Sequence, residues 1–232
     1  MVTQAFPKLF AITRIAFKPT AKGPHYIAPG LSPDCHVIEH SVFPVFEQYI
    51  QKNFREKRSQ ESYAFADIGG SKKNDRVKHL ARGMRYYIID IDPLEKDDLI
   101  IKGDICSCPQ VPSNSFDIIL NDNLMEHVKQ PWEAFSEMGR MLKSGGLCLT
   151  RTVFSWNYHP YPEDYWRFTH SALNYLAEKN GGLHTLESGY SINNRRSNHA
   201  GGNLEGNLDG IPIDGYGGWL EGWSVFHIGQ KP

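Results

Sequence analysis

The chain has 232 residues, of which 40% are hydrophobic, and its formal net charge is −1. This length and apolar content suffice for one sizeable core, so we predict a single main domain. The balanced, interspersed charge argues against nucleic-acid partners and a polybasic membrane signal, and no apolar run reaches the length of a bilayer span. The first residues show no signal-peptide pattern, so we expect a cytoplasmic location.

Cysteine and histidine spacing does not indicate a metal site. The four cysteines, Cys35, Cys106, Cys108 and Cys148, are too few for a disulfide framework and do not form the two close pairs of a zinc knuckle. The ten histidines show no H-E-x-x-H or comparable spacing. The sequence therefore predicts free thiols and no metal.

Residues 1–58 are predicted to form an arm and a helical segment ahead of the main domain at 59–232. Proline and glycine are frequent in residues 1–34, which indicates irregular structure. Apolar residues then recur at helical spacing across Cys35–Lys57, so we expect one or two amphipathic helices with a break at Pro44. These helices either pack on the sheet edge or form a lid over a bound ligand. As a lid they would contribute His36, His40 or Phe43 to the pocket.

The first strong pattern of the main domain is a strand followed by a glycine turn. The apolar run Tyr63–Ile68 predicts a buried strand, and Gly69, Gly70 and Ser71 follow as a turn that lets the backbone approach a ligand closely. A helix is expected to begin near Asn74. Strand, glycine turn and helix in this order are typical of nucleotide binding in a doubly wound sheet. The strict G-x-G-x-x-G spacing is absent, so a plain turn is an equal alternative.

Acidic residues follow the next two predicted strands. The run Tyr86–Pro93 predicts a strand that ends in acid about twenty residues after the glycine turn, where a carboxylate accepts hydrogen bonds from ribose hydroxyls. Asp90 is the expected residue, and a one-residue shift of the strand end would favour Asp92 instead. After a third strand at 99–102, Asp104 is placed to accept from an adenine amine while Ile105 packs on the ring.

The remaining elements continue the alternation of strands and helices. We predict a fourth strand at 115–121, a helix to about Leu142, a fifth strand at 147–152, a helix capped by Thr169, a sixth strand at 183–191 and a last strand at 223–228. Such alternation predicts a mostly parallel sheet covered on both faces. Residues 193–218 are rich in glycine and asparagine, which favours a mobile or disordered insertion over an ordered site.

Taken in order, these motifs resemble one family. D-I-G-G, I-I-D-I-D, G-D-I, S-F-D-I-I-L-N-D-N-L-M-E-H-V and R-M-L-K-S-G-G together resemble the class I S-adenosylmethionine-dependent methyltransferases across about residues 63–152. The segment H-P-Y-P-E-D-Y-W-R-F-T at 159–169 is similar to bacterial methyltransferases linked to sugar and surface-polysaccharide biosynthesis. The resemblance implies an α/β, Rossmann-like, doubly wound fold with seven mostly parallel strands, the last one reversed.

The resemblance also implies a cofactor, S-adenosylmethionine, which is converted to S-adenosylhomocysteine. One position departs from the family, because Ser71 replaces a further glycine and is followed by Lys72 and Lys73. A lysine there either pairs with the cofactor carboxylate or displaces the loop and weakens binding. The residues expected to bind the cofactor are Asp67, Gly69, Gly70, Ser71, Asp90, Ile91, Asp104, Ile105 and Asn121.

Aromatic and charged residues crowd the loop after the fifth strand. The histidine side chain is suited to proton removal near neutral pH, so His159 is the expected base, and Asp164 either orients its ring or binds a substrate hydroxyl. His127 either lies at the methyl-transfer point or organises its own loop. The alternative is a packed turn in which Asp164 pairs with Arg167 as a structural link. The residues expected to bind the substrate are Trp156, Tyr158, Tyr165 and Arg167, the last by gripping a phosphate or carboxylate.

The resemblance implies methyl transfer to a small molecule, with an oxygen of a sugar or related metabolite as the leading expectation for the acceptor. Transfer to nitrogen, on a small molecule or a peptide, is the alternative within enzymes. The altered loop after Gly70 also permits a catalytically silent, cofactor-binding subunit with a regulatory or scaffolding role. A nicotinamide-dependent oxidoreductase is disfavoured because the turn lacks the glycine spacing that admits a pyrophosphate. The sequence leaves the oligomeric state open.

Overall fold

The computed structural model describes most of the main domain and short parts of the preceding arm. The described residues are 19–20, 23–24, 35–38, 41–56, 62–156, 158–197 and 220–232. Most of the predicted irregular arm lies outside these residues, and so does His40 of the predicted helical segment. Of the predicted insertion at 193–218, residues 193–197 belong to a strand and the rest lies outside the described part.

The elements follow one another as the alternation of patterns predicts. The helical segments are α1 (Phe43–Ile50), the π-helical turn η1 (Gln51–Arg55), α2 (Asp75–Leu80), the 3₁₀ turn η2 (Met125–His127), α3 (Pro131–Met141) and α4 (His170–Lys179). The strands are β1 (Pro19–Thr20), β2 (Gly23–Pro24), β3 (Cys35–Ile38), β4 (Ala64–Ile68), β5 (Arg85–Asp90), β6 (Ile100–Lys102), β7 (Phe116–Asp122), β8 (Leu142–Ser155), β9 (His184–Ser197) and β10 (Leu220–Gln230).

The main sheet has the strand order β3-β9-β10-β8-β7-β4-β5-β6 in the described residues. β4 pairs in parallel with β5 and β7, β5 with β6, and β7 with β8. β10 is antiparallel to both of its neighbours, β8 and β9. The predicted reversal of the last strand is therefore confirmed. The predicted number of seven strands is wrong, because this sheet has eight.

The additional strand, β3, occupies a segment for which a helix is predicted. Its residues pair in parallel with the edge of β9, from Cys35 opposite Ser188 to Ile38 opposite Ser191. The two backbones approach closely at Gly189, where an added Cβ would lie 1.8 Å from the carbonyl oxygen of His36. The helical spacing of the apolar residues is misleading here because a long-range strand pairing decides the structure.

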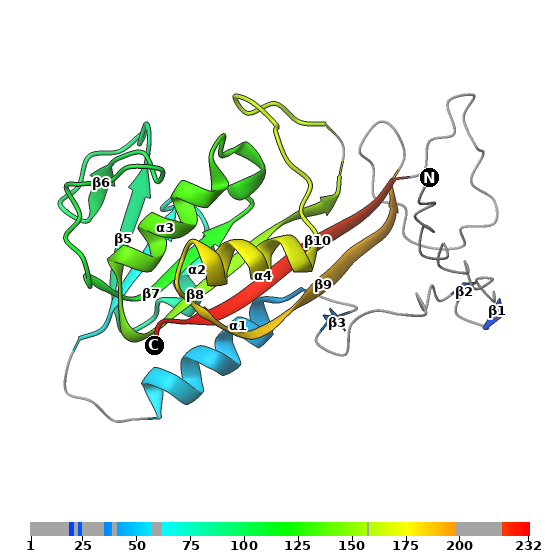
Figure 1. Cartoon of the computed structure of the whole chain (residues 1–232), viewed down its shortest axis with the longest axis horizontal. Helices are drawn as coiled ribbons and strands as arrows, with labels where there is room; N and C mark the ends of the chain where they lie inside the picture. Colours follow the sequence, from blue (N-terminus) through cyan, green and yellow to red (C-terminus); the bar gives the residue numbers. More distant parts are fainter. Residues whose placement is uncertain are drawn as a thin grey trace, which may run out of the picture.

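Helices cover the sheet on both faces, as Figure 1 shows. Along β4, alternate side chains enter different cores, since Phe65 packs with α1 and α2 whereas Ala66 packs with α3 and α4. The core under α1 and α2 includes Phe46, Ile50, Val77, Leu80, Phe65 and Ile118. The core under α3 and α4 includes Phe135, Met138, Leu173, Ala177, Ala66 and Ile119.

The helix predicted as a lid, α1, packs on the face of the sheet. Phe46 and Ile50 are fully buried against it. The predicted break at Pro44 is wrong. Pro44 lies in the first turn of the helix, where a backbone N–H would have no partner within the helix. Phe43 begins the helix beside Arg151 of β8, whose guanidinium carbon lies 6.0 Å from the ring centroid. A role of α1 as a lid stays a prediction.

β9 and β10 run side by side well past the helices, and β8 pairs with β10 along much of their length (Figure 1). The loop between β8 and α4 therefore begins far out at the carboxyl end of the sheet. Among the described helices, none is both long and apolar enough to cross a bilayer.

Candidate active site

The carboxyl ends of the central strands lie along one edge of the sheet. Ile68 of β4 is in register with Ile89 of β5 and with Asn121 of β7. The turns after these strands are tied to one another, since Gly69 donates from its backbone N–H to the carbonyl of Ile89 at 2.8 Å. The predicted cofactor residues therefore emerge from adjacent strands, as expected for a ligand that lies across the edge.

The glycine turn after β4 requires both of its glycines. Gly69 has a φ of +68°, a conformation that disfavours residues with a Cβ. A Cβ on Gly70 would lie 2.1 Å from Oδ2 of Asp67. Ser71, where the family usually has a further glycine, is exposed, and its hydroxyl accepts from the backbone N–H of Lys73 at 3.2 Å. The departure at Ser71 is thus accommodated within the turn.

Asp67 lies beneath this turn and is 2% exposed. Its Oδ2 accepts a hydrogen bond from the hydroxyl of Tyr86 at 2.6 Å. Burial raises the pKa of Asp67 to about 7, although the hydrogen bond from Tyr86 opposes this rise. The nearby carboxylate of Asp122 raises it further. With a pKa of about 7, Asp67 gains or loses its charge near neutral pH, and it does so directly beneath the glycine turn.

Asp90 and Asp104 stand at the tips of the next two strands and shape their own turns. Oδ1 of Asp90 accepts from the backbone N–H of Asp92 at 2.8 Å, and Oδ1 of Asp104 accepts from that of Cys106 at 2.8 Å. Beside Asp90, Ile91 is 65% exposed, whereas Ile105 is 7% exposed and packs in the core. The exposed apolar side chain of this pair is thus Ile91.

Asn121 is fully buried at the end of β7. Its Nδ2 donates to the hydroxyl of Thr150 at 2.9 Å and lies 3.3 Å from the sulfur of Met138, while its Oδ1 has no hydrogen-bond partner. The next residue, Asp122, forms a salt bridge with Arg151 in which both side chains are largely buried. The sequence analysis did not identify this pair, although strand alternation after Asn121 was a signal for it.

The side chain of Lys72 is held by ion pairs with two acidic residues. Its Nζ lies 2.7 Å from Oδ2 of Asp97 and 3.7 Å from Oε2 of Glu95. Both acids belong to residues 91–99, which connect β5 to β6 without a helix. Of the two alternatives for the altered loop, pairing with a cofactor carboxylate would require Lys72 to leave Asp97.

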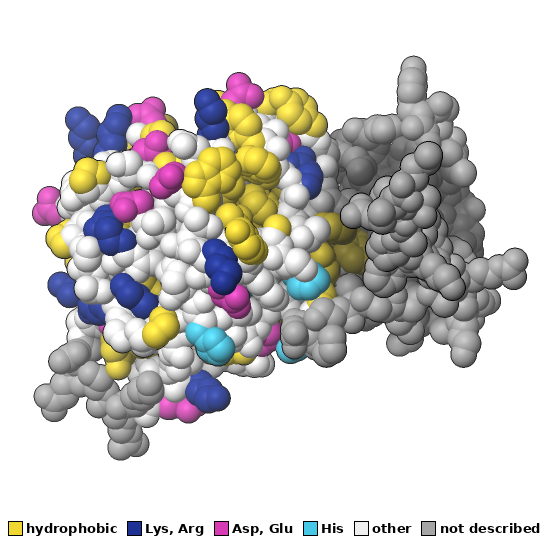
Figure 2. All heavy atoms as spheres, viewed as in Figure 1, with side chains coloured by type: hydrophobic (Ala, Val, Ile, Leu, Met, Phe, Trp, Pro, Cys, Tyr) yellow, Lys and Arg dark blue, Asp and Glu magenta, His cyan; other side chains and the backbone are white. Residues whose placement is uncertain are grey.

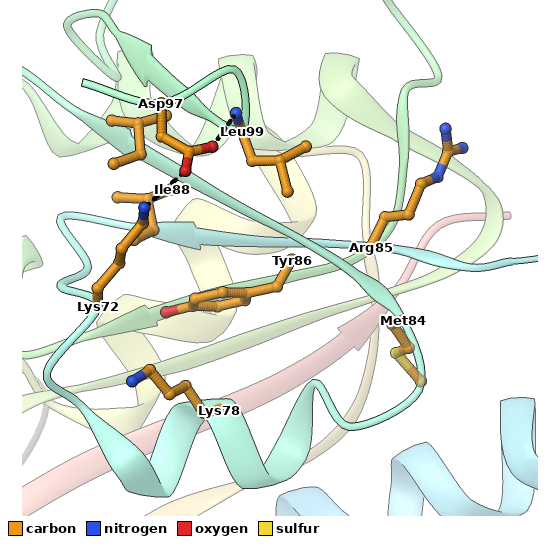
Figure 3. Close-up of a pocket in the computed structure, with 9 residues that line it drawn as sticks. Lys72, Lys78, Met84, Arg85, Tyr86, Ile88, Asp97 and Leu99 are labelled. Carbon is orange, nitrogen blue, oxygen red and sulfur yellow. Dashed lines mark hydrogen bonds and ion pairs between the residues drawn. The ribbon is translucent and has the colours of Figure 1, made fainter. Parts of the chain in front are cut away.

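A cavity of about 500 Å³ opens beside this connection, on the α2 side of β5. Figure 3 shows the aromatic ring of Tyr86 across its middle, with Lys72 and Asp97 at one end and Lys78 opposite. Tyr86 is the residue that donates to Asp67, so the cavity and the glycine turn share one side chain. The cavity lies alongside β5, lined by Arg85, Tyr86 and Ile88, and not at the carboxyl ends of the strands.

The second half of the site forms where the loop after β8 folds over η2. The backbone N–H groups of Tyr165 and Trp166 donate to the carbonyl of Glu126, at 2.8 and 3.2 Å. The indole N–H of Trp166 donates to the carbonyl of Val128 at 2.9 Å. These bonds hold the predicted substrate loop against the end of β7.

Glu126 is the central residue of this half and was missed by the sequence analysis. It is fully buried, and its Oε2 accepts a hydrogen bond from Thr152, whereas its Oε1 has no hydrogen-bond partner. Nε2 of His127 lies 4.0 Å from Oε1, and Nε2 of His159 lies 3.9 Å from it. The sequence signal was its position in M-E-H-V, directly before a histidine that was recognised.

The two predicted catalytic histidines lie together. The ring centroids of His127 and His159 are 4.9 Å apart, with the rings nearly perpendicular. Nδ1 of His127 lies 2.6 Å from the carbonyl oxygen of Glu163, and Nδ1 of His159 lies 3.2 Å from Oδ2 of Asp164. The structure therefore brings together residues that are more than thirty positions apart in the sequence.

Asp164 and Arg167 form a two-point ion pair, at 2.6 and 2.7 Å. Arg167 also donates to the carbonyl oxygens of Trp156 and Trp166. This guanidinium holds the pKa of Asp164 well below its usual range. Asp164 in turn accepts from the backbone N–H of His159 at 2.8 Å. The contacts are those of the structural link considered from sequence, and the direct roles of both residues stay predictions.

The aromatic residues of this loop reach the surface. Figure 2 shows apolar side chains gathered over the start of α3 and the loop after β8. Trp132 and Trp166 are part of this exposed set, with ring centroids 6.5 Å apart. The predicted substrate residues Trp156, Tyr158 and Tyr165 are 37%, 70% and 46% exposed. Their contact with a substrate stays a prediction.

The middle of the chain is similar to known methyltransferases. Residues 67–150 match the family described as a methyltransferase domain. An uncharacterized methyltransferase from Mycolicibacterium vanbaalenii is 29% identical over 107 residues, which cover 41% of this chain and 42% of that protein. The chain spans about two fifths of the length of the curated relatives it matches.

Solved structures extend the likeness to most of the chain. The YcgJ protein from Bacillus subtilis has a TM-score of 0.54 at 14% identity, covering 80% of this chain and 97% of that one. The 1,6-didemethyltoxoflavin-N1-methyltransferase from Burkholderia thailandensis, solved with 1,6-didemethyltoxoflavin and S-adenosylhomocysteine, has a TM-score of 0.51 at 13% identity, covering 83% of this chain and 79% of that one. The chain therefore matches the methyltransferase domain at residues 67–150 and adopts the fold of S-adenosylmethionine-dependent methyltransferases.

Proposed function

We propose that the protein is an S-adenosylmethionine-dependent methyltransferase that acts on an oxygen of a small molecule, a sugar or related metabolite. One observation carries the proposal. The glycine turn, Asp90 and Asp104 lie at one sheet edge, and the His127–His159 pair lies at the end of the next strands along it. The sugar acceptor rests on the resemblance of residues 159–169 to methyltransferases of that class.

The donor set at the edge fits an adenosyl cofactor. Asp90 offers a partly exposed carboxylate to ribose hydroxyls, and the exposed Ile91 beside it offers an apolar surface to the adenine. Oδ1 of Asn121 is a buried acceptor without a partner at the neighbouring strand end. When bound, S-adenosylmethionine supplies a methyl group already activated by the sulfonium, so the protein must supply alignment and a place for the proton of the acceptor.

His159 is the proposed proton acceptor. Because Nδ1 faces the carboxylate of Asp164, the neutral ring carries its hydrogen there and presents the lone pair of Nε2. With the cofactor bound, Nε2 of His159 would accept the proton that the acceptor hydroxyl loses as its oxygen takes the methyl group. Alignment contributes about 7–11 kcal/mol in favourable cases. A general base contributes about 10²–10⁴-fold, so alignment is the larger effect.

Isothermal titration calorimetry with S-adenosylmethionine and S-adenosylhomocysteine tests the cofactor half of the proposal. We expect both ligands to bind the full chain, and Asp90→Asn to weaken binding at least tenfold because the ribose loses its charged acceptor. Asp98→Asn, an exposed acid in the next loop, is the matched control and should bind as the wild type does. No binding of either ligand at millimolar concentration would leave the fold without this activity.

The acceptor half needs a panel of hydroxylated and amine-bearing small molecules incubated with labelled cofactor. We expect label to enter a sugar-like alcohol, and His159→Ala to slow that transfer about 10²–10⁴-fold with the affinity for the cofactor unchanged. Label found on nitrogen would contradict the oxygen acceptor. Equal turnover of His159→Ala and wild type would reject His159 as the base.

A further inference from the structure

Three potential metal ligands converge at the end of β7. Glu126 and both histidines, His127 and His159, each place one ligand atom within 4.8 Å of the other two. The atoms facing Oε1 of Glu126 are the two Nε2 nitrogens, at 4.0 and 3.9 Å. No metal-ligand spacing is visible in the sequence because two of these residues are adjacent and the third comes from a distant loop.

The facing atoms of this cluster are hydrogen-bond acceptors, with no donor among the three. A carbonyl oxygen only accepts hydrogen bonds, so Nδ1 of His127, at 2.6 Å from the carbonyl of Glu163, must be the donor. Its Nε2 is then an acceptor in the neutral ring. The same holds for His159, whose Nδ1 faces the carboxylate of Asp164. Three acceptor atoms therefore face one another, and Oε1 of the fully buried Glu126 has no hydrogen-bond partner among the described residues.

We propose that Glu126, His127 and His159 bind one divalent transition-metal cation. A cation placed between the three atoms would compensate the buried carboxylate of Glu126, whose Oε1 it would bind. Two imidazoles and one carboxylate favour Zn²⁺ or Mn²⁺ over Mg²⁺ and Ca²⁺, which prefer sites made of oxygen ligands alone. Nothing in this inference depends on methyl transfer, so the site is testable by itself.

The surroundings of the three ligands resemble those of established metal sites. Ligating histidines usually donate their second ring nitrogen to a carbonyl or a carboxylate, and here Glu163 and Asp164 supply one of each. Asp164 is itself fixed by Arg167, and Oε2 of Glu126 is held by Thr152. The orientation of all three ligands is thus set before any cation arrives.

The distances require the three side chains to move together. Ligands at about 2.1 Å from a tetrahedral metal are about 3.4 Å apart, so the two Glu126–histidine distances must shorten by about half an ångström. The ligand atoms of the two histidines, which lie within 4.8 Å of each other, must approach by up to about 1.4 Å. Three protein ligands leave at least one coordination position, which an acceptor hydroxyl can fill. A bound cation would occupy Nε2 of His159, so this nitrogen would be a ligand in the metal-bound protein and could act as the proton acceptor only in the metal-free protein.

Metal titration of the full-length protein, first treated with chelator, tests the proposal. Calorimetry with Zn²⁺ alone, and electron paramagnetic resonance with Mn²⁺ alone, should each show one bound cation per chain. Mg²⁺ at the same concentration should bind much more weakly. Glu126→Gln keeps the shape of the side chain, removes its charge, and should reduce the affinity for Mn²⁺ at least about 100-fold.

Two controls separate a lost ligand from a lost fold. Glu133→Gln and His184→Gln replace exposed residues elsewhere and should bind Mn²⁺ as the wild type does. Without metal, Glu126→Gln should unfold at a temperature no lower than the wild type, because it removes an uncompensated buried charge. Added Zn²⁺ should raise the melting temperature of the wild type and not that of the variant.

Two results would overturn the site. One is the absence of stoichiometric Zn²⁺ or Mn²⁺ binding by the folded wild type at millimolar concentration. The other is equal binding by wild type and Glu126→Gln. Because these readouts use metal alone, they remain distinct from a failure of cofactor binding in the preceding calorimetry.

Discussion

Tyr86 donates a 2.6 Å hydrogen bond to Asp67 from the neighbouring strand, and this bond lies between the glycine turn and the cavity on the α2 side of the sheet. Asp67 is almost fully buried, and burial raises the pKa of the Tyr86 hydroxyl well above its ordinary value. The tyrosine therefore remains a donor at every pH at which the protein is handled. The pair links the position of the turn to the charge of one carboxyl group.

Tyr86→Phe should destabilise the protein more at pH 8.5 than at pH 5. The change leaves Oδ2 of Asp67 without its donor, and an unsatisfied buried carboxylate costs about 1–3 kcal/mol. At pH 5 the carboxyl is protonated and the loss is smaller. Urea unfolding at both pH values checks this expectation, with the exposed Tyr175→Phe as the control. An equal loss at the two pH values would contradict it.

Asp67→Asn should flatten the dependence of stability on pH. The folded pKa of Asp67, about 7, exceeds the ordinary value of 3.8, so the folded state holds the proton more tightly than the unfolded chain. The stability that follows from this is fully present below pH 3.8 and is lost as the pH rises through about 7. Between pH 5 and 8.5 the wild type should lose about 1–3 kcal/mol relative to the variant. Parallel unfolding curves for the two proteins would show that burial does not hold this proton.

Gly70→Ala should weaken binding of S-adenosylhomocysteine at least tenfold. The new methyl group would meet the carboxylate of Asp67, so the turn must shift away from the sheet edge. Gly83→Ala is an instructive control, because that glycine also has a positive φ but open space around it. It should cost about 1 kcal/mol of stability and leave ligand binding unchanged. Calorimetry on both variants separates a displaced turn from backbone strain.

Arg167→Lys should loosen the loop after β8 without unfolding the domain. Lysine keeps the charge but cannot hold both oxygens of Asp164 and the carbonyl of Trp156 with one planar group. We expect a stability loss of about 0.5–1 kcal/mol and faster cleavage within residues 158–168 in limited proteolysis. Arg85→Lys, at an exposed position, should be cleaved at the wild-type rate. Unchanged proteolysis of Arg167→Lys would show that the loop is held by its backbone bonds alone.

Local rules predicted the central elements of this fold from sequence. The apolar run before Gly69 forms β4, and Asn74 and Thr169 cap α2 and α4 by accepting from Val77 and Ala172. These features depend on neighbours within a few residues, which the sequence displays directly. The edge strand β3 does not depend on such near neighbours, because its structure comes from pairing with β9 about 150 residues later in the chain. Pro44 was misread because proline suits the first turn of a helix as well as a break.

The candidate site divides in the same way. His127 and His159 were recognised individually from residue type and position, yet nothing local indicates that they face each other. Glu126 was overlooked because its burial depends on contacts from β8 and from the loop beyond it. Lys72 was expected near the cofactor, and its pairing with Asp97 depends on the path of a connection that lacks a helix.

The anchoring of Tyr165 and Trp166 on the main chain of Glu126 has a mechanical consequence. The residue that carries the loop on its carbonyl also places Oε1 of its side chain 4.0 and 3.9 Å from Nε2 of the two imidazoles. Moving the loop after β8 away from the sheet would displace the backbone of Glu126 and would separate His159 from His127. We therefore expect any molecule that reaches these imidazoles to do so with the loop in place, past the exposed aromatic side chains Trp156, Tyr158 and Tyr165.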